Sequence, residues 1–221
     1  MTIEAYRWYD YLPFGARRAY YRIFKAKKFW SMLEMREGED GALYSLSGFE
    51  QKQCIFVHIP KCAGISVSMT LFNNLGGGHL TIMDYNLIYS RALLKKYFIF
   101  TFVRNPWDRV YSAYTFLKKG GFNKEDAQWA EENLNKFKTF EQFVCDWVTE
   151  TNINTRVHFI PQYKFICNPY GKIQVDFIGR FENINDDFDF ISNKLGSDIK
   201  LTHENKSNNE KTDYAEYYNE K

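Results

Sequence analysis

One short segment of the chain combines the residue types that bind phosphate-like anions. It covers residues 60–66 (PKCAGIS) and lies between an apolar stretch and a helical pattern. A loop that turns from a strand into a helix presents free backbone N–H groups and the positive end of the helix dipole. Lys61 adds a cation, Gly64 allows close approach of the backbone, and Ser66 adds a hydroxyl. The segment lacks the GxxxxGK(S/T) pattern of a Walker A motif, and taken alone it also fits an ordinary structural turn.

A second segment with the same chemical character begins at Arg104 and reads RNPWDRVYSAY. Asn105 is a favourable N-cap, Pro106 suits the first helical position, and Asp108 can complete a capping box. Arg104 offers a planar fork for bidentate contact with a phosphate, and Ser112 adds a hydroxyl about two turns along the helix. The alternatives are a surface ion pair for Arg104 and a role in helix packing for Ser112.

The elements that must position these residues are repeated strand–helix units. Short apolar runs rich in β-branched and aromatic residues predict three buried strands, and each is followed by a helical pattern. Such units predict an α/β fold: a P-loop-like, three-layer α/β/α arrangement with a central, mostly parallel sheet, whose ligands bind at the carboxyl ends of the strands. The strands are expected at Cys54–Ile59, Tyr97–Val103 and Ile173–Ile178, and the helices at 64–75, 106–118 and 185–195.

Together, the two segments resemble the sulfotransferases that use 3′-phosphoadenosine-5′-phosphosulfate (PAPS). HIPKCAGIS is followed about forty residues later by FVRNPWDRVYSAY, and the similarity is greatest to the carbohydrate-modifying branch, over roughly residues 54–218. The resemblance implies a short, bacterial-type member. In that family the Pro-Lys loop holds the 5′-phosphosulfate and the Arg…Ser pair holds the 3′-phosphate, which here implies Arg104 and Ser112 for the second role. The first role falls to Lys61, Cys62, Ala63, Gly64, Ile65 and Ser66. Cys62 and Ile65 stand where the family usually has Thr or Ser, so binding there would depend more on backbone N–H groups.

The activity that this resemblance implies is that of a PAPS-dependent sulfotransferase of the EC 2.8.2 type, acting on a hydroxyl of a carbohydrate or glycolipid without a metal. Lys61 would stabilise negative charge on the bridging oxygen. His79, which follows three glycines, is the favoured catalytic base, since several relatives carry a histidine in a similar place and imidazole titrates near neutral pH. His158 is the rival base or an acceptor contact.

Other residues have weaker claims to a role. Arg180, at the end of the third expected strand, binds the nucleotide or an anionic acceptor, or pairs with Glu182. His58 is expected in the core or directly behind the residues of the site, and His203 at the surface. The aromatic residues of 119–150 wall the acceptor site or pack in the core.

Composition narrows the remaining possibilities. The chain has 221 residues, 45% of them hydrophobic, with 29 Lys+Arg and 27 Asp+Glu for a net charge of +2. The balance argues against a nucleic-acid partner, which usually meets a strongly basic domain. No apolar run approaches the ~18 residues of a spanning helix. A cytoplasmic location is therefore expected, and widely spaced cysteines predict free thiols rather than disulfides or a zinc site.

The N-terminal part differs from the rest in its charge. Basic and aromatic residues alternate along Ala16–Trp30, which predicts one amphipathic helix within an N-terminal extension at 1–50, preceding a sulfotransferase domain at 51–221. Such a helix either lies on a membrane surface, as a peripheral contact of residues 16–30, or packs its aromatic face on the domain. Two other functions stay open: a nucleotide kinase or NTPase on a similar fold, and a non-catalytic nucleotide-binding or membrane-associated scaffold.

Overall fold

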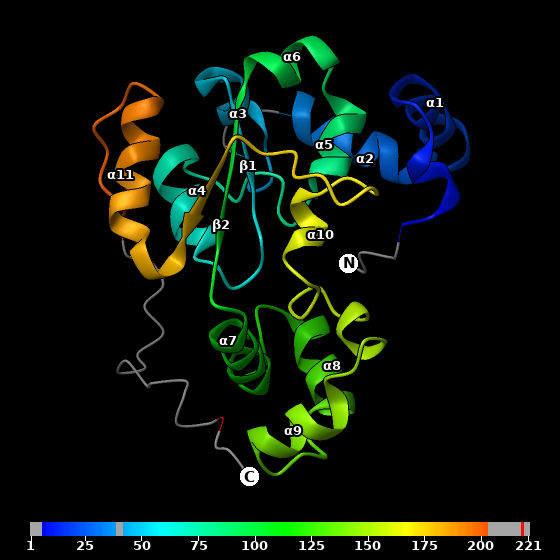
Figure 1. Ribbon diagram of the computed structural model, residues 1–221, viewed down its shortest axis with the longest axis vertical. Helices are drawn as coiled ribbons and strands as arrows, with labels where there is room; N and C mark the ends of the chain where they lie inside the picture. Colours follow the sequence, from blue (N-terminus) through cyan, green and yellow to red (C-terminus); the bar gives the residue numbers. More distant parts are fainter. Residues whose placement is uncertain (1–5, 39–41, 203–217, 219–221) are drawn as a thin grey trace. The chain divides into compact units, whose positions relative to one another are not determined.

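The computed structural model (Figure 1) describes residues 6–38, 42–202 and 218. The chain divides into two compact units, each treated by itself below. The sheet unit comprises Glu4–Val103 and Gln162–Asn205, and the helical unit comprises Met1–Ile3, Arg104–Pro161 and Lys206–Lys221.

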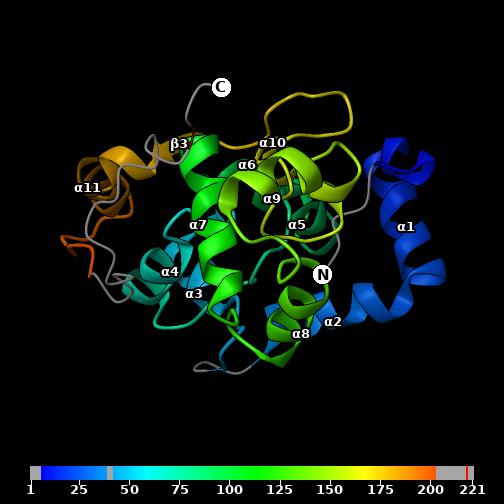
Figure 2. The same ribbon diagram turned by 90° about the horizontal axis from the view of Figure 1, so that it is seen from below.

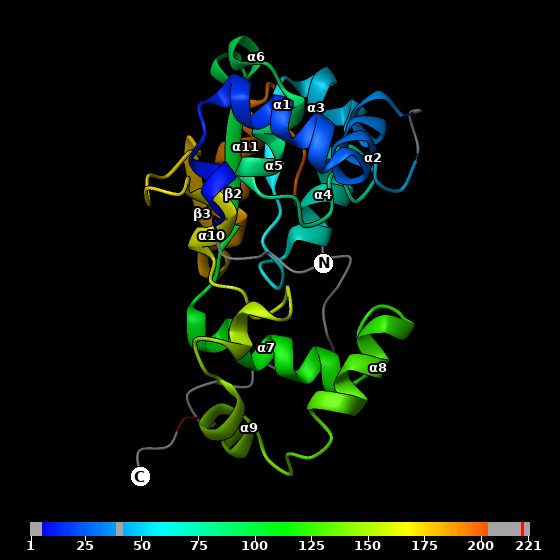
Figure 3. The same ribbon diagram turned by 90° about the vertical axis from the view of Figure 1, so that its right-hand side faces the viewer.

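The sheet unit is built around three parallel strands in the order β1-β2-β3. They are β1 (Cys54–Val57), β2 (Phe98–Val103) and β3 (Phe177–Arg180). Helices α4 (Gly64–Phe72) and α11 (Ile184–Lys194) cover one face, and α5 (Ile82–Ile88) and α1 (Phe14–Phe24) lie on the other, as Figures 1 and 3 show. All four residues of β1 are buried, which explains its continuous apolar sequence. The predicted α/β class with a parallel sheet is confirmed.

The third strand begins four residues later than its apolar sequence predicts. Ile173 instead forms an isolated antiparallel bridge with Cys167. Asp176 then joins the chain to the sheet: its backbone N–H donates to Ile99 O at 2.7 Å, and its carboxylate accepts from Ile99 N at 2.8 Å. The apolar run from Ile173 therefore belongs partly to a hairpin-like loop rather than to the sheet.

The N-terminal basic and aromatic segment forms two helices, so the prediction of one helix over 16–30 is wrong. Helix α1 ends at Phe24 and α2 (Ala26–Glu37) begins directly after Lys25, whose backbone (φ −125°, ψ 35°) leaves the helical region. Tyr21 and Phe29 are buried, and both helices contact α5. They pack on the sheet unit, and the expected domain boundary near residue 50 stays a prediction.

Two cations attach these helices to α5. The Arg17 guanidinium donates to Met83 O at 2.6 Å, and Lys28 Nζ lies 2.7 Å from Asp84 Oδ1. Burial alone would raise the pKa of the Asp84 carboxyl, but Lys28 and hydrogen bonds from Thr81 outweigh that effect and hold the pKa below its usual range. Thr81 and Asp84 also form the capping box that starts α5.

Helices α5 and α6 were not predicted from the sequence. Several short elements complete the sheet unit. These elements are η1 (Trp8–Tyr11), α3 (Ser47–Lys52), α6 (Arg91–Lys96), α10 (Tyr163–Ile166) and η3 (Phe181–Asn183). In the described ranges no disulfide is present: Cys54, Cys62 and Cys167 are buried and Cys145 is exposed. Burial raises the pKa of Cys54 to about 12, so this thiol stays protonated near neutral pH. No helix of these ranges combines the length and apolar character needed to cross a bilayer.

The helical unit has an aromatic core. Helices α7 (Pro106–Lys118), α8 (Lys124–Asn133) and α9 (Phe140–Trp147), followed by η2 (Asn152–Asn154), gather around it (Figures 1 and 2). Phe143 is fully buried, and its ring centroid lies 5.1 Å from that of Trp147 and 5.4 Å from that of Phe159. The aromatic residues that could have walled an acceptor site pack largely against one another. Of these, Phe137, Phe140, Phe143 and Trp147 are buried and Trp129 is partly buried, and Tyr114 and Phe159 complete the cluster.

Candidate anion-binding site at the carboxyl end of β1

The turn after β1 has the backbone geometry of an anion cradle. Lys61 (φ 67°) and Ala63 (φ 59°) both adopt left-handed conformations, which are uncommon for residues with a Cβ atom. They bend the chain so that α4 begins at Gly64, and Val67 N donates to Ala63 O at 3.1 Å. The N–H groups of a helix's first turn have no acceptor within the helix, so they can donate to an anion.

The imidazole of His58 occupies the space beside Gly64. A Cβ atom added at Gly64 would lie 1.7 Å from His58 Cδ2 and 2.0 Å from Nε2, distances at which atoms overlap. His58 is 7% exposed and its ring stacks on Phe56, with centroids 5.8 Å apart. Glycine is therefore required at position 64 because the imidazole takes the place of a side chain.

His79 lies on the other side of His58. The two ring centroids are 4.6 Å apart, and His79 Nδ1 is 3.4 Å from His58 O. The glycines before it turn the chain, with φ +55° at Gly76 and +59° at Gly78. In the tautomer that carries its proton on Nδ1, Nε2 of His79 is an acceptor. The structure thus brings His79 to the turn through His58, and leaves it partly exposed.

The Cys62 thiol holds the turn in place. Its sulfur lies 3.4 Å from Gln162 Oε1 and 3.7 Å from Pro60 O, and the residue is buried. Cys62 therefore faces the interior, whereas Lys61 and Ile65 are partly exposed. An anion at this turn would meet backbone N–H groups and Lys61 rather than a row of hydroxyls.

Arg180 is the last residue of β3. It therefore lies at the carboxyl ends of the parallel strands, as the turn after β1 does. It pairs with Val103 across the sheet, and its backbone N–H donates to Asp187 Oδ2 at 2.6 Å. The residue is exposed. This position is compatible with an anion-binding role, which stays a prediction.

Arg104 and Ser112 belong to the helical unit, at the start of α7 and on it. Asn105 caps the helix by accepting from Trp107 N and Asp108 N, as predicted. Asp108, expected to close a capping box, instead binds Arg104 in a bidentate pair: Nε to Oδ2 is 2.6 Å and Nη2 to Oδ1 is 2.8 Å. Ser112 is partly buried. The pair fixes the plane of the guanidinium.

The rival base His158 also belongs to the helical unit. It is 8% exposed, and its ring centroid lies 5.3 Å from that of Phe116. Lys61, His79 and Arg180 thus share the sheet unit, whereas Arg104, Ser112 and His158 belong to the other. His203 falls outside the described residues. No group of three metal-ligating side chains gathers within the described parts of the chain.

Comparison with known proteins assigns the family. The profile of the sulfotransferase family matches residues 49–220, which include β1, the turn and α7. The chain belongs to the sulfotransferase family. The match covers both candidate segments, Lys61–Ser66 and Arg104–Ser112.

Two relatives place this sulfotransferase among known sequences. An uncharacterized protein of Archaeoglobus fulgidus is 34% identical over 107 residues, which are 48% of this chain and 73% of the relative. Carbohydrate sulfotransferase 14 of Danio rerio is 29% identical over 121 residues, 48% of this chain but 32% of the relative. The chain therefore matches about a third of the length of that second protein. No solved structure matches this chain.

The contact of His58 with Gly64 was not predicted from the sequence. A histidine inside an apolar strand was expected in the core or behind the site residues, and it is buried, but its contact with Gly64 depends on the turn between them. The available signal was the glycine six residues later, since a glycine at a helix start often marks a close approach.

Gly64→Ala is expected to destabilise the fold by about 1–3 kcal/mol, because the added methyl group overlaps the His58 ring and one of them must move. Gly15→Ala is the matched control: no atom lies within 4 Å of its added Cβ, so this helical substitution should stabilise by up to about 1 kcal/mol. Urea unfolding midpoints measure both. A Gly64→Ala midpoint equal to that of the parent chain would show that the imidazole does not occupy this space in solution.

Proposed function

We propose that this protein transfers the sulfuryl group of PAPS to a hydroxyl of a carbohydrate or glycolipid. The observation that carries the proposal is the turn after β1, where two left-handed residues aim a helix N-terminus outward beside Lys61 and a partly exposed histidine. An anionic donor group fits such a turn. The name of the Danio rerio relative adds support for the carbohydrate acceptor.

The 5′-phosphosulfate would be held by the segment Lys61–Ser66. The donor supplies an activated sulfuryl group: the acceptor oxygen forms a bond to sulfur as the bond from sulfur to the bridging phosphate oxygen breaks. The ammonium of Lys61 and the first-turn N–H groups of α4 would stabilise the negative charge that the leaving nucleotide gains. Since the Cys62 thiol faces the interior, charge stabilisation at this turn would depend mainly on Lys61 and these N–H groups.

His79 would remove the proton of the acceptor hydroxyl. With its Nδ1 proton directed to His58 O, Nε2 can accept a proton. His58 then acts as a positioning residue, because its ring contacts His79 on one side and Gly64 on the other. The ring of the rival base, His158, packs in the helical unit against Phe116.

The 3′-phosphate would be bound by Arg104 and Ser112, with Arg180 as a further contact for the nucleotide or an anionic acceptor. Arg104 donates two hydrogen bonds to the Asp108 carboxylate, and these fix the orientation of the planar guanidinium. A fixed fork loses less side-chain entropy on binding.

The transfer itself is tested by incubating the protein with PAPS and a glycan extract and searching by mass spectrometry for glycans that have gained one sulfuryl group. His79→Ala should lower this turnover by about 10²-fold or more and leave nucleotide affinity nearly unchanged. His158→Ala should retain most of the turnover. The reverse pattern would move the base to His158, and the absence of any sulfated product with the parent chain would contradict the proposed function.

Arg104→Ala is expected to abolish the preference for a 3′-phosphate. Calorimetric titration with adenosine 3′,5′-bisphosphate, AMP and ATP measures it, and the lost charged contact should weaken the bisphosphate about 10- to 100-fold without affecting AMP. Asp108→Asn keeps the guanidinium and should retain the preference. An unchanged preference in Arg104→Ala would show that the 3′-phosphate binds elsewhere. Tighter binding of ATP would favour a kinase or NTPase, and no nucleotide binding would favour a scaffold.

We further propose that the α1–α2 corner contacts an anionic membrane surface. Ile23 and Phe24 are each 68% exposed at the end of α1, and Trp30 on α2 is 46% exposed with Arg22 over its ring at 5.7 Å. Lys25 and Lys27 add positive charge, and a cavity of about 520 Å³ lies at the corner. The residues lining this cavity are Phe24, Lys25, Ala26, Lys27, Lys28 and Ser31. Exposed apolar residues beside cations suit the boundary of anionic headgroups.

Sedimentation with phosphatidylcholine vesicles, with and without phosphatidylserine, tests this contact. The parent chain should bind only the anionic vesicles, and Ile23→Ser/Phe24→Ser should bind them at least about tenfold more weakly because two apolar side chains are lost. Phe122→Ser removes an equally exposed aromatic residue of the helical unit (63% exposed) and should leave binding unchanged. Equal sedimentation of all three proteins would contradict the contact.

A further inference from the structure

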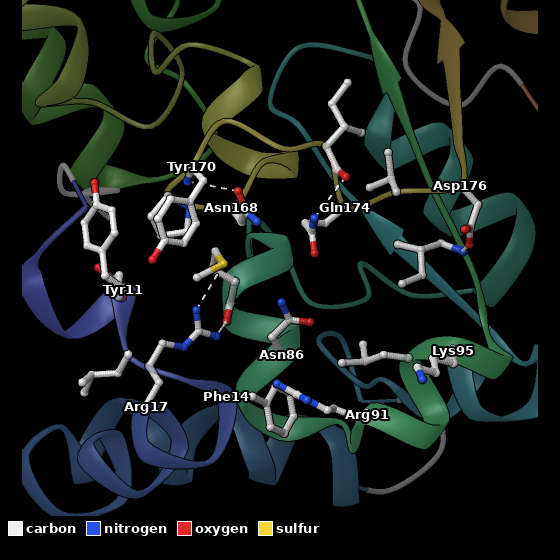
Figure 4. A pocket seen from close by; sticks show the side chains of 18 residues that line it. Tyr11, Phe14, Arg17, Asn86, Arg91, Lys95, Asn168, Tyr170, Gln174 and Asp176 are labelled. Atoms are coloured by element: carbon white, nitrogen blue, oxygen red, sulfur yellow. Dashed lines mark hydrogen bonds between the residues drawn. The ribbon is translucent and has the colours of Figure 1, made fainter.

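A second cavity lies at the amino ends of the parallel strands, whereas the turn after β1 lies at their carboxyl ends (Figure 4). Its volume is about 560 Å³, and all of its lining residues belong to the sheet unit. Ile99, near the start of β2, and Asp176, just before β3, form part of its wall. The turn follows the other end of these parallel strands. Since β2 has six residues and a strand rises about 3.3 Å per residue, the two ends of the strands are roughly 16 Å apart.

Three cations line this cavity. Arg17 is 4% exposed, and its guanidinium donates to the carbonyl and the sulfur of Met83, at 2.6 and 3.1 Å. Arg91, from α6, lies over the ring of Phe14 at 5.0 Å, and Lys95 follows one turn later on the same helix. Within the described residues no carboxylate forms an ion pair with any of these three. A buried guanidinium with only neutral partners is unusual, because burying an uncompensated charge is costly.

The two acidic residues of the cavity are engaged elsewhere. Asp10 accepts hydrogen bonds from Arg7 N at 3.0 Å and from the hydroxyl of Tyr21 at 3.2 Å. The carboxylate of Asp176 accepts from Ile99 N at 2.8 Å. Asp10 and Asp84 both act electrostatically on Arg17, although neither forms an ion pair with it among the described residues. Because the donors to Asp10 and Asp176 are neutral, both carboxylates keep their charge, and the three cations of the lining outnumber them by one.

The rest of the wall carries groups suited to a polyhydroxylated ring. Tyr11 and Tyr170 meet edge to face with centroids 5.4 Å apart, and Tyr170 is 75% exposed. Asn86 and Gln174 point into the space from opposite sides in Figure 4, and the carboxamide oxygen of Asn168 is fixed by Tyr170 N at 3.0 Å. Gln174 Nε2 donates to Lys172 O at 3.3 Å and to Ile173 O at 3.1 Å, so its carboxamide oxygen is the acceptor for a sugar hydroxyl. Aromatic faces pack on the apolar faces of sugar rings.

We propose that this cavity binds an acidic saccharide, a sugar that carries a carboxylate or a sulfate ester. The anionic group would pair with Arg91 and Lys95 and approach Arg17, while hydroxyls bind the carboxamides and the ring packs on Tyr170. An adenosine bisphosphate also carries anionic groups that pair with such cations, and the titrations below distinguish it from a saccharide. The inference does not rest on sulfuryl transfer, since binding needs neither donor nor turnover.

Calorimetric titration of the full chain with a chondroitin sulfate hexasaccharide tests the proposal, with neutral maltohexaose as the comparison ligand. Arg17 is left intact because its substitution could prevent folding. Arg91→Gln/Lys95→Gln removes the two exposed cations and should lower the affinity for the acidic hexasaccharide at least about tenfold. Lys96→Gln, on the same helix but outside the cavity lining, should not change the affinity. Equal thermal unfolding temperatures establish that the variants are folded.

Tyr170, the aromatic residue on which the sugar ring would pack, allows an independent test. Tyr170→Ala should weaken the hexasaccharide severalfold, and Tyr163→Ala, an exposed tyrosine outside the lining (54% exposed), should not. Saturating adenosine 3′,5′-bisphosphate should leave the hexasaccharide affinity unchanged. Equal binding by the double variant, equally tight binding of maltohexaose, or competition by the nucleotide would each overturn the proposal. None of these outcomes depends on whether the protein transfers sulfate.

Discussion

The contact between the His58 imidazole and the Cα of Gly64 is the constraint on which the sheet-unit site depends. It brings the end of β1, the start of α4 and the loop that carries His79 against one ring. The left-handed backbone of Lys61 and Ala63 follows from it, because the chain must reverse within a few residues to place Gly64 over the strand that it has just left. Cys62 anchors the same turn from within. The chemistry of the site is therefore a property of packed backbone more than of a row of reactive side chains.

Charge is used locally throughout the molecule. The net charge of +2 is close to neutral, yet positive groups are concentrated at the turn after β1, at the α1–α2 corner and around the cavity between α1 and α6. Each of these places offers N–H donors or cations, and at the cavity three cations outnumber two carboxylates. Net charge therefore excludes a polyanion bound over the whole surface, and it does not bear on small anions in defined sites.

Local signals predicted the elements that carry the site, and failed where tertiary contacts decide. Helix α7 was predicted at its observed bounds because Asn105 and Pro106 fix its start within the sequence itself. The run from Ile173 was expected to be a strand because it is apolar, but Asp176 determines where pairing with β2 begins. The break at Lys25 also has no local breaker such as glycine or proline. It occurs where α1 and α2 must both reach α5, through Arg17 and Lys28.

The central claim is that the turn after β1 binds the phosphosulfate end of a nucleotide donor. The most direct measurement is a ¹⁵N nuclear magnetic resonance titration with adenosine 3′,5′-bisphosphate, which reports each backbone amide separately. The structure predicts that the largest amide shifts occur within residues 61–66, followed by His79. Large shifts confined to the cavity between α1 and α6, with the turn unaffected, would contradict it.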